Sequence, residues 1–127
     1  MAKAKSKTEK KIDNNIRLAL TAACDQFLED VPGFQWLTHQ ANYTNFPASL
    51  MVTCIFDTDD SFHHADKQKI YKVIQGKLLK IGVRFKSPEG QVMFDSEEAC
   101  IRDDDGKWNV RLERLKGRSI PRNRPEQ

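Results

Sequence analysis

Apolar and polar positions alternate along the chain with two different periods. From Ile12 to Val31 an apolar residue recurs at every third or fourth position, which places the apolar side chains on one face of an amphipathic helix. A Pro-Gly pair then stops the pattern, so the sequence predicts a helix over residues 10–30. A second helical repeat follows an aspartate-rich stretch that suits a helix start, and it predicts a helix over residues 61–81.

The remaining apolar segments are short and read as strands. The segment 34–43 alternates in the manner of a strand with one partly exposed face, and 50–56 is β-branched and apolar on both faces, as in a central strand. A short apolar segment, 91–94, comes next. An Asp-Gly pair then separates 99–102 from 108–112, and this arrangement predicts a β-hairpin.

The predicted order of elements is therefore α-β-β-α-β-β. Short connections favour antiparallel pairing, and helices on one side of such a sheet bury both of their apolar stripes. We expect an α+β fold with two helices packed on one face of a mostly antiparallel sheet. The 127 residues suit a single domain, which we place at residues 10–115.

The sequence shows no pattern of a membrane span, a secretory signal or paired cysteines. No apolar run approaches the roughly 20 residues of a membrane span, and no apolar stretch follows the basic start as in a secretory signal. The three cysteines form no CxxC pair, so reduced thiols are expected rather than disulfides or zinc ligands. These features predict a cytoplasmic protein without membrane contact.

Charge is concentrated at the two ends. The net charge is +3, but residues 1–11 carry five lysines against one glutamate and residues 116–127 carry four basic residues against one acidic. Residues 1–9 have too few apolar residues to offset the entropy of ordering, and Gly117, Pro121 and Pro125 make regular structure unlikely in the C-terminal tail. We therefore expect disordered basic tails at residues 1–9 and 116–127, on either side of a mildly acidic domain.

The residues that often carry catalysis or bind metals do not form a recognisable site. The acidic clusters lack the glycine and glutamate spacing of a calcium loop, and the adjacent His63 and His64 point in directions too different to bind one metal. There is no nucleophile elbow and no phosphate-binding glycine loop. The sequence thus predicts no catalytic residue, no metal and no cofactor, and a protein that is not an enzyme.

Basic residues offer a possible contact with nucleic acid. The candidates are Lys67, Lys69, Lys72 and Lys80 on the outer face of the predicted helix 61–81, and Arg118, Arg122 and Arg124 in the C-terminal tail. Contacts of this kind give weak, salt-sensitive and sequence-independent binding. The alternative for the lysines is an ordinary solvated helix surface.

One stretch of the chain carries a resemblance. The run Gly33–His39 (GFQWLTH), together with Asn42-Tyr43 and Phe46–Leu50 (FPASL), resembles a family of small uncharacterised bacterial proteins. Some of its members are labelled as regulators of the Fis type, and for them the resemblance implies a helical domain ending in a basic helix-turn-helix that binds DNA. This sequence departs from that pattern at its C-terminal third, which is predicted as a hairpin, so no site residue is transferred.

Three functional hypotheses follow. The first is a non-enzymatic interaction module that works on or near nucleic acid through its basic tails and the helix 61–81. The second is a protein–protein adaptor or homodimer that uses its sheet, suggested by the aromatic strand 34–43. The third is a small-ligand or enzymatic site near His39.

Overall fold

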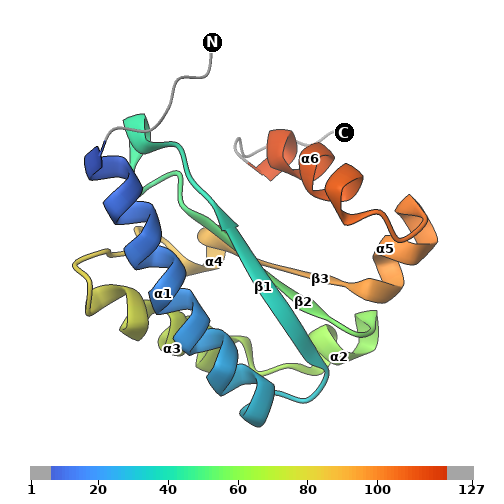
Figure 1. Cartoon of the computed structure of the whole chain (residues 1–127). Coiled ribbons are helices and arrows are strands. Elements are labelled where there is room, and N and C mark those ends of the chain that lie inside the picture. The colour runs from blue at the N-terminus through green and yellow to red at the C-terminus, as the bar shows by residue number, and fades with distance from the viewer. Residues whose placement is uncertain (1–6, 120–127) are drawn as a thin grey trace.

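The computed structural model describes the backbone of residues 7–119 and the side chains of residues 8–114. The elements in chain order are α1 Lys7–Asp30, β1 Phe34–Gln40, the short 3-10 helix η1 Tyr43–Asn45, β2 Met51–Phe56, α2 Asp59–His64, α3 Lys67–Leu79, α4 Pro88–Gln91, β3 Val92–Ser96, α5 Glu97–Asp104 and α6 Trp108–Ser119. Figure 1 shows α1 and α3 on one side of the sheet, and α5 and α6 on the other.

The described residues form one mixed sheet with the strand order β1-β2-β3. β1 pairs with β2 in antiparallel fashion, but β3 runs parallel to β2. The α+β class is confirmed, whereas the expected mostly antiparallel sheet and α-β-β-α-β-β order are corrected. The reason is the connection through α2, α3 and α4, which returns the chain to the end of the sheet at which β2 began.

The main core lies between the sheet and the pair α1 and α3. Fully buried residues of α1, α3 and β2 form it: Ile16, Leu20, Ala23, Phe27, Ile70, Ile74, Leu78, Val52, Cys54 and Phe56. The even-numbered positions of β2 thus point to α1 and α3, and its odd-numbered positions point to α6. α1 and α3 pack on one face of the sheet, but the predicted two-helix packing is corrected in detail, because α5 and α6 lie on the opposite face (Figure 1).

The C-terminal third is helical, so the predicted hairpin of 99–102 and 108–112 is wrong. The Ser96 hydroxyl caps α5 by accepting a hydrogen bond from the Ala99 N–H at 2.9 Å. Asp105 and Gly106 then adopt positive φ angles of 57° and 76°, and the Gly106 N–H donates to the Cys100 carbonyl at 3.0 Å. An Asp-Gly pair suits both a hairpin turn and a helix C-terminus, and here it ends a helix.

The predicted helix 61–81 is two helices. The chain is extended at Ala65 and Asp66, and the Asp66 carboxylate accepts a hydrogen bond from the Lys69 N–H at 3.1 Å to start α3. An aspartate inside a helical repeat therefore acts as a new N-cap.

The boundaries of the two predicted tails also change. α1 already includes residues 7–9, and α6 continues through residues 116–119. Glu9 lies in the first turn of α1, where a carboxylate stabilises the positive end of the helix dipole. The remaining tail residues lie outside the described residues. No described helix is both long and apolar enough to cross a membrane.

Candidate functional site

The four candidate lysines of the predicted helix have different environments. Lys72 and Lys80 are exposed to solvent. Lys69 is also exposed, and its Nζ lies 4.0 Å from the Asp30 carboxylate. Lys67 is half-buried, because its Nζ donates to the Phe62 carbonyl at 2.7 Å and lies 5.3 Å from the centre of the Phe94 ring. Lys67 therefore stabilises the end of α2, and the other three are exposed, with Lys69 near the Asp30 carboxylate.

The arginines of the C-terminal tail are only partly covered by the structure. Arg118 lies in the last turn of α6, but its side chain is outside the described set. Arg122 and Arg124 lie outside the described residues. Of the seven candidate residues, the structure describes the side chains of the four lysines.

The segment that contains α3 is strongly basic. Residues 67–86 include seven lysines and arginines and not one aspartate or glutamate. Five of the basic side chains are exposed, and we call them the basic face: Lys69, Lys72, Lys80, Arg84 and Lys86. The sequence reasoning missed the last two, although the lack of acidic residues over this stretch is visible in the sequence.

Gly76 lies within the basic face. Positions 69, 72, 76 and 80 follow one another at helical spacing, so Gly76 is on the same side of α3 as the three lysines. A Cβ atom added at Gly76 would meet no atom within 4 Å. The basic face therefore has an open point in its middle, where a large group can approach the helix backbone closely.

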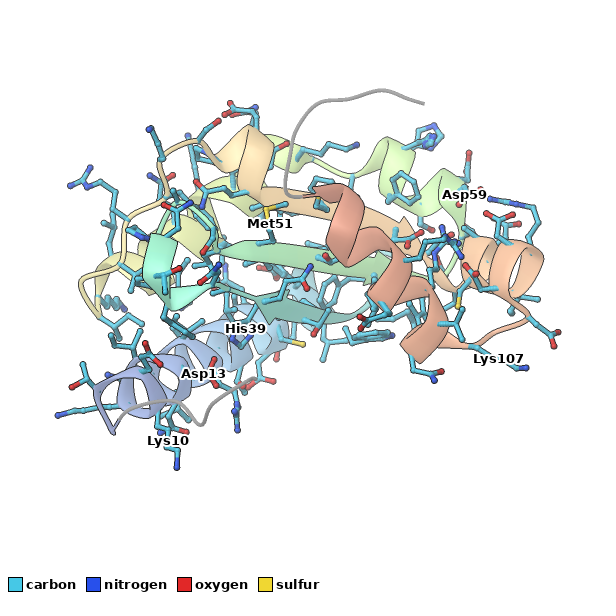
Figure 2. The ribbon with its side chains drawn as sticks, turned by 90° about the horizontal axis from the view of Figure 1, so that it is seen from above. Lys10, Asp13, His39, Met51, Asp59 and Lys107 are labelled. Carbon is cyan, nitrogen blue, oxygen red and sulfur yellow. The ribbon has the colours of Figure 1, made fainter. Side chains whose placement is uncertain are left out.

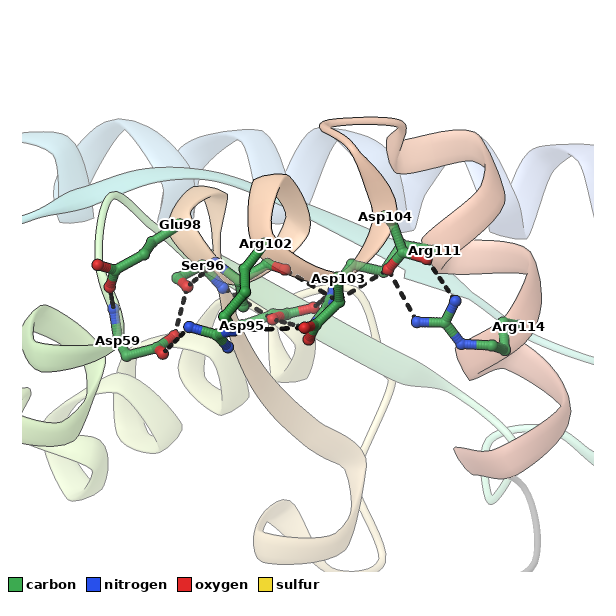
Figure 3. A network of polar contacts seen from close by, with 10 residues as sticks. Asp59, Asp95, Ser96, Glu98, Arg102, Asp103, Asp104, Arg111 and Arg114 are labelled. Carbon is green, nitrogen blue, oxygen red and sulfur yellow. Dashed lines mark hydrogen bonds and ion pairs between the residues drawn. The ribbon is translucent and has the colours of Figure 1, made fainter.

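Acidic side chains gather where α2 meets α5 (Figure 3). The Asp59 carboxylate accepts hydrogen bonds from the Ser96 hydroxyl at 2.6 Å and from Arg102 at 3.0 Å. These donors, the Ser96 hydroxyl first, lower the pKa of Asp59. The Asp59 N–H in turn donates to Glu98 at 2.9 Å, so these contacts join α2 to α5.

Arg111 anchors α6 to the rest of the fold (Figure 3). Its side chain is buried and donates twice to the buried Asp95 of β3, through Nε at 2.6 Å and through Nη2 at 2.9 Å. Nη1 donates to Asp104 at 2.9 Å. Hydrogen bonds from Arg114 and from Arg111 lower the pKa of Asp104 to about 2. This cluster is a paired structural network rather than a vacant charged site.

Two tryptophans share one carboxylate beside this network. The indole N–H groups of Trp36 and Trp108 donate to the two oxygens of Glu97, at 2.8 and 2.7 Å. Their rings meet edge to face with 5.1 Å between centroids. These contacts hold the first turn of α6 against β1. Both indoles are engaged within the fold and do not form an exposed aromatic surface.

His39 belongs to a polar cluster at the end of β1. Its Nε2 lies 3.2 Å from Asp13 on α1, and the same carboxylate oxygen accepts a hydrogen bond from the Tyr43 hydroxyl at 2.8 Å. Burial and this hydrogen bond raise the pKa of Tyr43. Figure 2 shows Asp13 and His39 together at one end of the molecule and Asp59 at the other.

The thiols give little support to nucleophilic chemistry near His39. Cys24 is half-buried on α1, and burial raises its pKa, as it does for the fully buried Cys54 and Cys100. A thiol with a raised pKa is mostly protonated at neutral pH and is a poor nucleophile. Among residues 8–114, no group of three or more histidine, cysteine or acidic side chains is placed to hold a metal ion.

Comparison with known proteins identifies no family for this chain. No protein-family model, curated protein or solved structure matches this chain. The resemblance of its N-terminal half to a bacterial family with Fis-type members therefore stays a prediction, and the functional conclusions depend on the geometry and charge of the chain itself.

Proposed function

We propose that this protein is a non-enzymatic module that binds nucleic acid through the basic face. The observation that best supports the proposal is the segment 67–86, which has seven basic residues, no acidic residue and five exposed cationic side chains. A cationic surface of this kind binds a polyanion by releasing its counterions.

The expected ligand groups are backbone phosphates rather than bases. Binding to single strands usually relies on exposed aromatic rings that stack on bases. Here Trp36 and Trp108 contact each other and Glu97, and Tyr43 donates to Asp13. These rings are held by the fold, so we expect duplex binding with little sequence preference.

The pair of helices at the C-terminal end is a poorer candidate for this role. α5 and α6 are joined by the short turn 105–107, which gives them the outline of a helix-turn-helix. However, residues 97–107 carry a net charge of −3 and residues 108–119 carry +3, so the pair has no net charge to attract phosphates. Arg111 and Arg114 of α6 are also already paired with Asp95 and Asp104. In Figure 1, α3 and the chain that follows it lie away from the acidic α5.

The proposal is tested by fluorescence anisotropy of a labelled duplex at several salt concentrations. Five phosphate contacts give a slope of about −4 to −5 for log K against log salt, and each lysine removed reduces its size by about one. We expect Lys72→Ala/Lys80→Ala to reduce the slope by about two. The matched control Lys10→Ala/Lys107→Ala removes two exposed lysines elsewhere (Figure 2) and should reduce it less.

A third variant separates the basic face from the C-terminal tail. Arg118→Ala/Arg122→Ala/Arg124→Ala in the full chain removes the tail arginines and leaves α3 intact. If this variant loses binding while Lys72→Ala/Lys80→Ala keeps it, the tail is the binding element and the proposal for the basic face is wrong. If the two lysine pairs have equal effects, only net charge matters and the proposal also fails.

A further inference from the structure

We propose that the free edge of β1 binds an extended segment of a partner protein, with alternating apolar and basic side chains, as an added strand. This inference goes beyond nucleic-acid binding and uses another part of the molecule. It gives a specific form to the hypothesis of a protein contact through the sheet.

β1 is an edge strand. Among the described residues it pairs only with β2, so its other side has no neighbouring strand. The Cys24 thiol of α1 lies close to the Leu37 backbone N–H. An N–H on the free side of β1 would gain a stronger acceptor in the carbonyl of an added strand, because sulfur is a weak acceptor.

A groove lies on each face of β1 along its free edge. A groove of about 310 Å³ lies toward α1 and is lined by Leu20, Cys24 and Leu37, with Arg17 among its other residues. A second groove of about 330 Å³ lies between the sheet and α6. Thr38 and His39 line both grooves, so the two hollows meet at this point of the strand.

This shape fits an extended chain better than a compact ligand. Successive side chains of a strand point to opposite faces, so an added strand fills both grooves at once, while its backbone pairs with β1. A small molecule would fill one groove and leave the backbone edge unused. A second copy of this chain is also a poorer occupant, because its own α1 would have to enter beside the same edge (Figure 2).

The two grooves are lined by different side chains. This difference indicates which side chains the added strand would place in each groove. The groove toward α1 has an apolar part formed by Leu20, Leu37 and Cys24, beside the polar residues Arg17, Thr21, Thr38 and His39. In the groove toward α6, Leu112 is the one apolar lining residue and the exposed Glu113 is the one carboxylate, with no lysine or arginine among the lining residues. Apolar side chains suit the first groove and basic side chains suit the second.

The experiment uses the full chain and a fluorescein-labelled peptide of alternating valine and lysine. A block peptide of the same composition, all valines followed by all lysines, has equal charge but cannot place the two types on opposite faces. We expect the alternating peptide to bind about tenfold or more tightly than the block peptide in anisotropy titrations. Amide hydrogen exchange at Leu37 and His39 should slow when it binds, because these groups then pair with the added strand.

A charge reversal in the second groove provides the matched comparison. Glu113→Lys should weaken binding of the alternating peptide about tenfold or more, whereas Glu29→Lys, at an exposed position of α1 outside both grooves, should change it less than about twofold. Prior reaction of Cys24 with N-ethylmaleimide should also abolish binding, because the adduct fills the first groove.

Three results overturn the proposal. Equal affinity for the two peptides, or equal loss in the two charge-reversal variants, means that the lysines bind a diffuse acidic surface. No binding below about 1 mM rejects the stated partner chemistry. Light scattering that shows a dimer in which the β1 amides are protected without any peptide means that a second copy occupies the edge. None of these results bears on the duplex titration, which tests the other surface.

Discussion

Replacement of Arg111 by methionine tests how α6 is held to the domain. The guanidinium makes two hydrogen bonds to Asp95, a carboxylate that is only 6% exposed. Methionine keeps the apolar stem but leaves that charge without its cationic partner. Breaking a buried pair in this way costs about 3–5 kcal/mol. We expect a value near 3 kcal/mol, since the Ser96 N–H still donates to Asp95.

The assay is urea unfolding followed by far-UV circular dichroism. A loss of about 3 kcal/mol is a large part of the 5–15 kcal/mol by which domains are usually stable, so the midpoint should fall clearly. The control is Arg102→Met, the same substitution at an arginine whose side chain is 55% exposed and paired with Asp59. An exposed pair of this type contributes far less to stability than a buried one, because solvent screens it.

A double variant decides whether the cost comes from the unpaired charge. Arg111→Met/Asp95→Val removes both partners, and replacement of a whole buried pair by apolar residues is often close to neutral. We expect it to recover more than half of the stability lost in Arg111→Met. If Arg111→Met costs no more than Arg102→Met, or if the double variant is as unstable as the single one, the Arg111 network does not anchor α6.

Four further predictions concern stability and reactivity. Gly76→Ala should raise the free energy of unfolding by about 0.5–1 kcal/mol, because the helix has room for a methyl group there. Gly33→Ala should lower it by more than about 1 kcal/mol, because φ is +84° and a Cβ would lie 2.4 Å from a serine oxygen; urea unfolding measures both. In a titration with a disulfide reagent, Cys24 should react in the native protein and the two buried thiols only after unfolding. Because the pKa of Asp104 is lowered to about 2, its contribution to stability is present above about pH 4 and is lost as the pH falls toward 2. Stability curves of the wild type and Asp104→Asn should therefore converge over that interval, and curves that stay parallel would contradict the assignment.

Local patterns in the sequence were sufficient for the first half of the fold. The apolar repeat of α1 and the alternation of β1 and β2 depend on contacts that each element makes along one face, and a period reports such a face directly. The Asp-Gly pair at 105–106 was not sufficient, because positive φ angles serve a hairpin and a helix end equally well. The parallel pairing of β3 depends on where a long connection returns, and no local pattern encodes that.

Local sequence patterns also predict only part of the candidate surfaces. The basic segment 67–86 is visible in the sequence, but only the structure shows that Lys67 is bound to the Phe62 carbonyl and a neighbouring ring. Asp95 and Arg111 are 16 positions apart and look like two ordinary surface charges until β3 and α6 meet. The grooves beside β1 combine residues from α1, β1, β2 and α6, so their existence depends on the whole arrangement.

The parallel pairing of β2 with β3 has a consequence for synthesis of the protein. Gln40 of β1 pairs with Met51 of β2, which is synthesised 11 positions later. Val52 of β2 pairs with Val92 of β3, which is synthesised 40 positions later. At about 5–20 residues per second, β2 spends about 2–8 s without its second neighbour as the chain grows. β2 is largely buried in the complete fold, so nascent chains that end before β3 expose an unpaired apolar strand edge and should be prone to aggregate.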